Sequence, residues 1–217
     1  MKRNLIWLVL AAMLVALAGC GGGDDRPLVT TEISRDAAAD GDILQDIANV
    51  RIVTLVGLDS AATVFAGVDP LNDDVYRAFL SFPLTSIPFN AAIRSATLSI
   101  VIRSVTVSPP SAAIPIRIEL VSFDPTLIPP LVGSYFDRAV LLPLPASTLI
   151  SPPITSADVN GEVIVDVTTL MVEAQLRQLN DFQVRILQEN DFTTTVPGLI
   201  EIDEIFPSEP LLTVVWF

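Results

Sequence analysis

The chain has 217 residues, of which 51% are hydrophobic, so its composition is that of a folded protein with one sizeable core. Its formal net charge is −13. Removing residues 1–19, which hold Lys2, Arg3 and no acidic residue, leaves 10 basic and 25 acidic residues, or −15. A surface this acidic repels phosphate backbones, which excludes nucleic acid as an expected partner. It also repels anionic lipid headgroups, so membrane contact requires something other than a basic patch.

The residue types that are missing restrict the chemistry of the chain. It has no histidine, which removes Ser-His-Asp and Cys-His constellations and every histidine-based zinc site. Cys20 is the only cysteine, so no intramolecular disulfide can form. After residue 19 there is no lysine either, and the usual bases and Schiff-base nucleophiles are therefore absent. We expect a protein with no catalytic residues and no cofactor, although calcium is considered below.

Residues 1–20 read MKRNLIWLVLAAMLVALAGC and have the anatomy of a secretory signal. Lys2 and Arg3 give a positive start, and residues 5–17 form an uninterrupted apolar run. A membrane-spanning helix needs about 20 apolar residues, and this run is shorter. The pattern therefore predicts a signal peptide over residues 1–19.

The end of this segment, Leu17-Ala18-Gly19-Cys20, resembles the bacterial lipobox. The resemblance implies that a diacylglyceryl group is attached to the Cys20 sulfur, that cleavage occurs before Cys20 and that the new amine is acylated. Such acyl chains suffice for stable membrane anchoring. Gly21 stands where the sorting rule of enteric bacteria places an aspartate to retain lipoproteins in the inner membrane. We therefore expect a lipid-anchored protein of the cell envelope, in the outer rather than the inner membrane.

Residues 20–44 are polar and begin with three glycines, which predicts a flexible tether with at most one early strand. After it, short runs rich in β-branched residues recur with turn signals between them. The predicted strands cover residues 50–56, 62–68, 77–82, 96–107, 114–123, 163–167, 182–187, 199–202 and 211–216.

Seventeen prolines punctuate the chain and exclude long helices across the proline pairs. One helix is predicted, at residues 168–179, with Asp166 or Thr168 capping its start and Asn180 at its C-terminal end. Many short strands with one helix indicate an all-β fold. We expect residues 45–217 to form one antiparallel β-sandwich of the jelly-roll type.

Several packing motifs carry a resemblance to a known family. They are Arg77 to Phe82 (RAFLSF), the following PLTSIP and IRSATL, the VDVT at residues 165–168 and the PLLTV at residues 210–214. Their order resembles the DNRLRE-type domain, a jelly-roll module of secreted bacterial proteins related to carbohydrate-binding modules. The resemblance implies the sandwich fold and a carbohydrate ligand. The motifs are packing patterns, so they predict strands and turns but no ligand site. The chain departs from the family in lacking the DNRLRE string itself and the Trp residues usual before the DvT strand.

Two acidic groups are candidate cation sites. Asp69, Asp73 and Asp74 lie in one predicted turn and supply the oxygen ligands that calcium prefers. They lack the spacing of an EF-hand, and a solvated turn explains them better. The other group, Glu201 to Glu204, is interpreted as a solvent-facing strand end.

Other residues suggest ligand contacts. Arg77 could hold the carboxylate of an acidic sugar, but pairing with an acid such as Asp166 is the simpler interpretation. Tyr135 and Phe136 lie in a loop-rich stretch where an aromatic ring could stack on a sugar. Trp216, in the last strand, is expected to belong to the core.

Three functions follow from these observations. The first is a membrane-anchored lipoprotein whose β-sandwich binds an extracellular polysaccharide. The second is a structural or envelope-assembly lipoprotein that contacts proteins through its apolar, proline-rich loops at residues 128–132 and 141–149. The third is an enzyme acting on acidic polysaccharide, which would require clustered carboxylates with an arginine or tyrosine in one groove.

Overall fold

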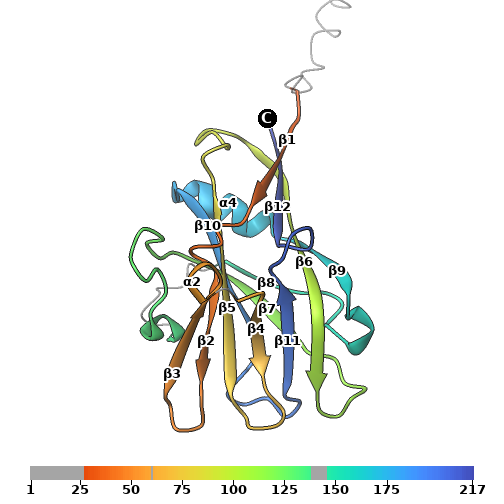
Figure 1. The fold of residues 1–217 in the computed structure, drawn as a ribbon. Coiled ribbons are helices and arrows are strands. Elements are labelled where there is room, and N and C mark those ends of the chain that lie inside the picture. The colour runs from red at the N-terminus through yellow and green to blue at the C-terminus, as the bar shows by residue number, and fades with distance from the viewer. Residues whose placement is uncertain (1–26, 60, 138–145) are drawn as a thin grey trace, which may run out of the picture.

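Antiparallel strands build almost the whole domain in the computed structural model, which describes residues 27–59, 61–137 and 146–217 (Figure 1). The strands are β1 Val29–Ser34, β2 Gly41–Gln45, β3 Arg51–Leu55, β4 Thr63–Val68, β5 Val75–Pro83, β6 Ile93–Val107, β7 Ile116–Val121, β8 Ser147–Leu149, β9 Gly161–Asp166, β10 Asp181–Gln188, β11 Gly198–Asp203 and β12 Leu211–Trp216. The helices are α2 Val56–Asp59 and α4 Thr168–Leu176, with 3-10 turns η1 Gly133–Phe136 and η2 Ser156–Asp158.

The strands form two layers that join at the hairpin between β4 and β5. One layer follows the order β1-β12-β6-β11-β4, with β9 on the other edge of β6. The other follows β5-β10-β7-β8, with β2 on the free edge of β5 and β3 beyond it. Only two residue pairs connect β4 to β5, so the sheet can fold over at this point. The predicted antiparallel β-sandwich is confirmed.

Alternation along the strands places the main core between the layers. In β6 every second residue from Ala96 to Ile102 is buried, which is the period expected for a strand with one face inward. The facing layer contributes inward residues such as Leu80 of β5, Val184 of β10 and Ile118 of β7. Each of these side chains is fully buried, so this core supplies most of the hydrophobic stabilisation.

The second layer is buried on its outer face as well. A separate hydrophobic cluster there combines Phe79 of β5 and Val121 of β7 with Phe123, Leu131 and Phe136. The last three residues belong to the connection after β7, which crosses back over the sheet. This cover explains why β5 and β10 are buried at nearly every position instead of at alternate ones.

The predicted helix is confirmed but is shorter than expected. α4 ends at Leu176 because Gln178 adopts a left-handed conformation (φ 55°) and the Leu179 N–H bonds back to the Ala174 carbonyl. At its start, the Asp166 carboxylate accepts a hydrogen bond from the Thr168 N–H at 2.9 Å.

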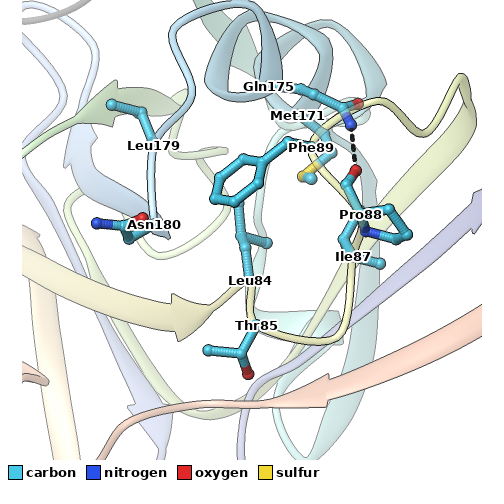
Figure 2. A pocket seen from close by; sticks show the side chains of 9 residues that line it. All are labelled: Leu84, Thr85, Ile87, Pro88, Phe89, Met171, Gln175, Leu179 and Asn180. Atoms are coloured by element: carbon cyan, nitrogen blue, oxygen red, sulfur yellow. Dashed lines mark hydrogen bonds between the residues drawn. The ribbon is translucent and has the colours of Figure 1, made fainter.

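A loop of residues 84–92 lies beside α4 at the end of the sandwich where the chain joins β1 (Figure 1). The Gln175 Nε2 donates a hydrogen bond to the Pro88 carbonyl at 2.9 Å (Figure 2). The loop is therefore tied to the helix.

All nine predicted strands are observed, and the main difference lies at the start of the domain. The range 20–44, expected to be a tether, contains β1 and nearly all of β2, so the folded part begins well before residue 45. The short strand β8 was not predicted either. Across residues 27–59, 61–137 and 146–217, no helix has both the length and the apolar character that crossing a bilayer requires.

A buried acidic cluster fastens the early strands to the rest of the sandwich. Arg35, just after β1, contacts Glu204 at 2.6 Å (Nε to Oε2) and Asp40 at 3.8 Å (Nη1 to Oδ2). The Ser81 N–H donates to Asp40 Oδ1 at 2.7 Å. Glu204 is only 2% exposed, so its interpretation as part of a solvent-facing strand end was wrong. β11 ends at Asp203, one residue before Glu204, and the spacing of the acidic residues gives no sign of this end.

Burial changes the acidity of these carboxyl groups. It raises the pKa of Glu204 to about 8, with Arg35 opposing the shift. Burial and the nearby Glu204 also raise the pKa of Asp40 well above its ordinary value. Asp42 is a further case, since burial raises its pKa to about 7 against a hydrogen bond from the Phe65 N–H. These groups hold protons in the folded state that the unfolded chain releases near pH 4.

We predict that the domain is more stable in mild acid than in mild base. Raised carboxyl pKa values stabilise the fold fully below about pH 4, and this contribution is lost as the pH rises through 7 to 8. The free energy of unfolding should therefore fall by about 1 to 3 kcal/mol between pH 5.5 and pH 8.5. Urea unfolding across this range measures it, and the absence of histidine removes the usual titrating group from the window.

Glu204→Gln should flatten this pH dependence, because it replaces the titrating group by a neutral one of the same shape. The matched control is Glu32→Gln, which removes the same charge from an exposed position of β1. A wild-type stability that rises with pH, or equal effects of the two variants, would contradict the prediction.

Candidate functional site

Charged side chains gather on the outer face of the second layer, between neighbouring strands. Arg77 of β5, Arg185 of β10 and Glu119 of β7 each stand next to a residue of the inner core, so strand alternation points them outward. Register then brings them together, because Arg185 lies directly opposite both Phe79 and Glu119. The charged groups and the outer hydrophobic cluster therefore share one face.

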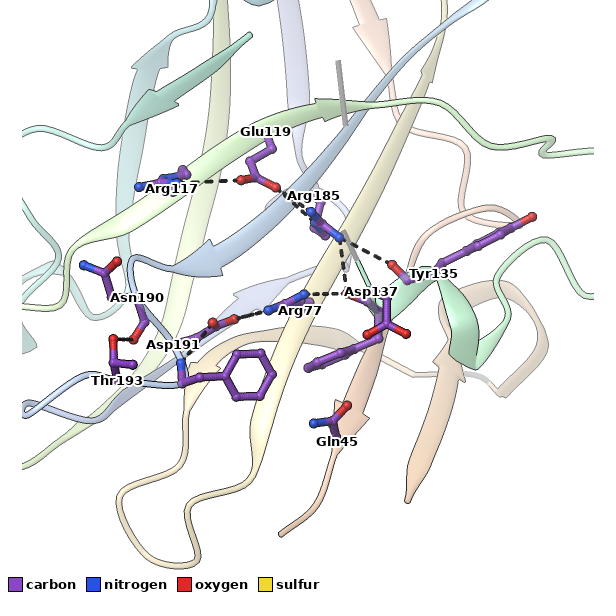
Figure 3. Close-up of polar contacts among 12 residues, drawn as sticks. Gln45, Arg77, Arg117, Glu119, Tyr135, Asp137, Arg185, Asn190, Asp191 and Thr193 are labelled. Carbon is purple, nitrogen blue, oxygen red and sulfur yellow. Dashed lines mark hydrogen bonds and ion pairs between the residues drawn. The ribbon is translucent and has the colours of Figure 1, made fainter. Parts of the chain in front are cut away.

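Arg185 is the centre of this group and has no exposed surface. Its Nε and Nη2 donate to Glu119 Oε2 at 3.2 and 2.6 Å. Its Nη1 donates to the backbone carbonyls of Tyr135 and Phe136 at 3.4 and 3.3 Å (Figure 3). One buried cation thus joins β10 to β7 and also holds the turn η1 onto the sheet.

Arg77 approaches the same turn from the neighbouring strand. Its Nη1 donates to the Phe136 carbonyl, and its Nε and Nη2 donate to Asp191 Oδ2 at 2.9 and 2.7 Å. The guanidinium lies 4.1 Å from the centre of the Phe136 ring and 5.3 Å from that of Phe192. Two arginines therefore converge on a single carbonyl oxygen, and one of them packs against two aromatic rings that also contact each other.

Two further ion pairs complete the rim. Arg117 of β7 donates to Glu189 at 2.5 Å. Arg51 of β3 donates to both carboxylate oxygens of Asp137 at 2.7 Å, and this hydrogen bonding lowers the pKa of Asp137. The group then contains four arginines and four carboxylates, whose formal charges cancel: Arg51, Arg77, Arg117 and Arg185 with Glu119, Asp137, Glu189 and Asp191.

A pocket of about 330 Å³ opens among these side chains, at the lower end of the usual size of small-molecule sites. The loop between β10 and β11 forms one wall, with Asn190 exposed and Phe192 61% exposed at its edge. The pocket thus presents guanidinium and carboxylate groups, an amide and one accessible aromatic ring. This combination suits a neutral ligand with several hydroxyl groups and an apolar face.

The sequence interpretation located part of this site. Arg77 belongs to it, but its partner is Asp191 and not Asp166, whose carboxylate accepts a hydrogen bond from the first N–H of α4. Tyr135 and Phe136 belong to it through their carbonyls, since the Phe136 ring is fully buried and Tyr135 packs against Phe123. Neither ring is the exposed platform that the sequence suggested.

Arg185 and Phe192 were missed. The signal for Arg185 is a lone cation inside the apolar strand run FQVRIL, where it must find a buried partner. The signal for Phe192 is a single aromatic residue in a polar turn, NDFTTT, between two strands. Trp216 is partly buried against the main core, as expected, and its Nε1 donates to Thr31 Oγ1 at 3.0 Å.

Asp69, Asp73 and Asp74 lie in the turn between β4 and β5 and line no part of this pocket. The Asp69 carboxylate accepts from the Leu71 N–H at 2.9 Å, and the Asp74 carboxylate accepts from the Asn72 amide at 2.7 Å. Both thus bond within their own turn. Among the residues that the structure describes, no three His, Cys, Asp or Glu side chains are grouped so as to hold a metal ion.

Leu17, Ala18, Gly19 and Cys20 lie outside the described residues, and so do residues 141–145 of the second apolar loop. The lipid attachment inferred from the sequence therefore remains a prediction.

We predict that Arg185 and Glu119 depend on one another for stability. Arg185→Met removes the closest cation from a buried carboxylate and should lower the free energy of unfolding by about 3 to 5 kcal/mol. The double variant Arg185→Met/Glu119→Leu should recover a large part of this loss, because no buried charge is then left without its closest counter-charge. Urea unfolding of the single and double variants gives the coupling energy. Additive losses would contradict the prediction.

Comparison with known proteins adds no assignment. No family model matches the chain, and no curated protein is significantly similar to it.

Proposed function

We propose that this chain is an exported lipoprotein, anchored to the cell envelope through Cys20, whose β-sandwich binds an extracellular polysaccharide. The support for export and anchoring is the sequence of residues 1–20, with its positive start, short apolar run and lipobox-like ending. Gly21 in place of an aspartate favours the outer membrane. The sandwich fold fits this proposal, since it is the fold that the resemblance to the DNRLRE-type domain implies.

The observation that carries the binding proposal is the charge-balanced pocket beside Phe192. Because each guanidinium in it has a nearby carboxylate, neither a free anion nor a free cation finds an excess of opposite charge there. Sugar hydroxyls can share hydrogen bonds with these groups, and the exposed ring of Phe192 can pack on the apolar face of a sugar. We therefore favour a neutral polysaccharide over the acidic one considered from Arg77 alone.

An enzyme acting on acidic polysaccharide would require carboxylates clustered with an arginine or tyrosine in one groove, and this pocket has such a cluster. Each carboxylate nevertheless lies within ion-pair distance of an arginine, which favours a role as a hydrogen-bond acceptor over one as a proton donor. We therefore propose binding without catalysis. Envelope assembly remains the second candidate, supported by the connection after β7, where Ile128 is 92% exposed and Leu127 is 48% exposed.

We expect the purified protein to bind neutral oligosaccharides on a glycan array, both with and without calcium. Phe192→Ala should weaken binding by about tenfold or more, measured by isothermal titration calorimetry, because the exposed ring is lost. Phe206→Ala is the matched control, since Phe206 is 80% exposed in the turn between β11 and β12 and lines no part of the pocket.

An array without hits would count against polysaccharide binding and would favour the assembly candidate. If Phe192→Ala and Phe206→Ala weakened oligosaccharide binding equally, the pocket would not be the binding site. Release of shortened oligosaccharides during the titration would instead support the enzyme alternative.

Anchoring is tested separately at Cys20. We expect mass spectrometry of the mature protein from bacterial membranes to show an N-terminal Cys20 carrying acyl chains, and Cys20→Ala to move the protein out of the membrane fraction. A free Cys20 thiol, or a mature protein that still starts at Met1, would contradict the anchoring part of the proposal alone.

A further inference from the structure

A mainly apolar groove lies at the end of the sandwich that carries α4. The groove has a volume of about 330 Å³ and lies between the helix and the loop 84–92 (Figure 2). Leu84, Ile87, Phe89, Met171 and Leu179 contribute its apolar walls. A second, shallower hollow continues on the far side of Phe89, so this ring stands as a ridge between two hollows.

Apolar side chains surround this ridge and are open to solvent. Phe89 is 67% exposed, Leu176 is 74% exposed and Val172 is 37% exposed. Near the start of the described chain, Leu28 and Val29 are 61% and 38% exposed. Such large apolar groups at one end of a domain mark a surface that something covers.

Hydrogen bonding connects the groove to the place where the chain joins the fold. Val29 of β1 is paired with Trp216 of β12. The next residue, Phe217, exchanges two backbone hydrogen bonds with Ala92 at 3.0 and 3.2 Å, and Ala92 is three residues from Phe89. Figure 1 shows the same arrangement, with β1, the C-terminus, the loop before β6 and α4 at one end of the sandwich.

The length of the segment before β1 limits which end of the domain can meet a membrane. Cys20 and Pro27 are seven residues apart, and a chain of that length spans at most about 25 Å. β6 runs from this end to the opposite one, and its 15 residues cover about 45 to 50 Å. A protein anchored at Cys20 therefore cannot stand on its opposite end, whereas the α4 end lies within reach of the bilayer.

The charge of the groove suits the same contact. The residues that line the groove and the neighbouring hollow are all uncharged, and the nearby exposed Arg94 belongs to β6. The one charged residue of α4, Glu173, is paired with Arg177 at 2.6 Å. Little charge would thus have to leave water when this surface meets acyl chains. The surface offers no basic patch, so the contact would depend on apolar burial and not on anionic headgroups.

We propose that the α4 end is a membrane-contact surface, with Phe89 and Leu176 inserted at the interface between headgroups and acyl chains. This inference rests on the lipid anchor of the proposed function. It gives the domain a defined orientation, in which the ion-pair pocket and its Asn190–Phe192 wall face away from the bilayer.

The test uses the acylated full-length protein in vesicles of phosphatidylcholine, a lipid without net charge. Acylation occupies the only natural cysteine, so an introduced cysteine can carry an environment-sensitive fluorophore at one place. Asn90→Cys places the probe on the exposed loop beside Phe89, and Asn72→Cys places it on an exposed turn at the opposite end. Lipids with a spin label on the acyl chain should quench the probe at residue 90 by about twofold or more and leave the probe at residue 72 unchanged.

Adding Phe89→Ser and Leu176→Ser to the Asn90→Cys protein should remove most of this quenching while the protein still floats with the vesicles. Floating protein without quenching at residue 90, or with equal quenching at residues 72 and 90, would overturn the membrane-contact surface and leave the anchor intact. A blue-shifted probe at residue 90 in detergent, together with a concentration-dependent dimer, would assign the groove to a second copy and would also overturn it. Protein that does not float and whose Cys20 accepts the fluorophore would refute the anchor itself, on which the inference rests.

Discussion

The outer half of this domain depends on two buried arginines that share one carbonyl oxygen. Arg77 and Arg185 both donate to the backbone of Phe136, while Asp191 and Glu119 balance their charges. Buried guanidinium groups are tolerated only when their charge and their N–H donors are satisfied. Meeting this requirement fixes the turn η1 against the sheet. The covering segment then encloses the outer hydrophobic cluster, which buries the second layer on both faces.

This constraint also shapes the candidate binding site. Two of its ion pairs, Arg77–Asp191 and Arg185–Glu119, are buried, so moving one partner would leave the other buried without its closest counter-charge. Its polar groups are therefore presented in a fixed geometry before any ligand arrives, which reduces the ordering cost of binding. Phe192 is different, since it lies on an exposed turn and owes its place to the contact with Arg77. The pocket thus combines a fixed polar floor with one accessible ring.

In the proposed arrangement the two ends of the sandwich have separate roles. The α4 end carries uncharged, exposed apolar residues beside the start of β1, and the other end carries acidic turns and the wall of the pocket. The excess negative charge of the chain is compatible with this division, because it keeps the outward surface soluble and away from anionic headgroups. The buried acids Asp40 and Glu204 lie between β1 and the β11–β12 connection. They help to fasten the first strand, through which any force from an anchor would pass.

The sequence by itself determined the all-β class, nine of the strands and the helix, because alternation and turn residues are local signals. It also contains the whole basis for the proposal of a lipid anchor, which rests on a linear motif. The sequence predicted at most one strand where β1 and β2 lie, because their polar residues resemble a tether, and their strand state comes from pairing with β12 and β5. The site was only half predicted for a similar reason. The sequence indicates Arg77 as a candidate site residue without its partner. Its pairing with Asp191, 114 residues away, depends on which strands are neighbours in the sheet. The ion pairs of the pocket, the buried carboxyl groups and the groove beside Phe89 are each formed by residues that lie far apart in the sequence. Only the tertiary structure could therefore show them.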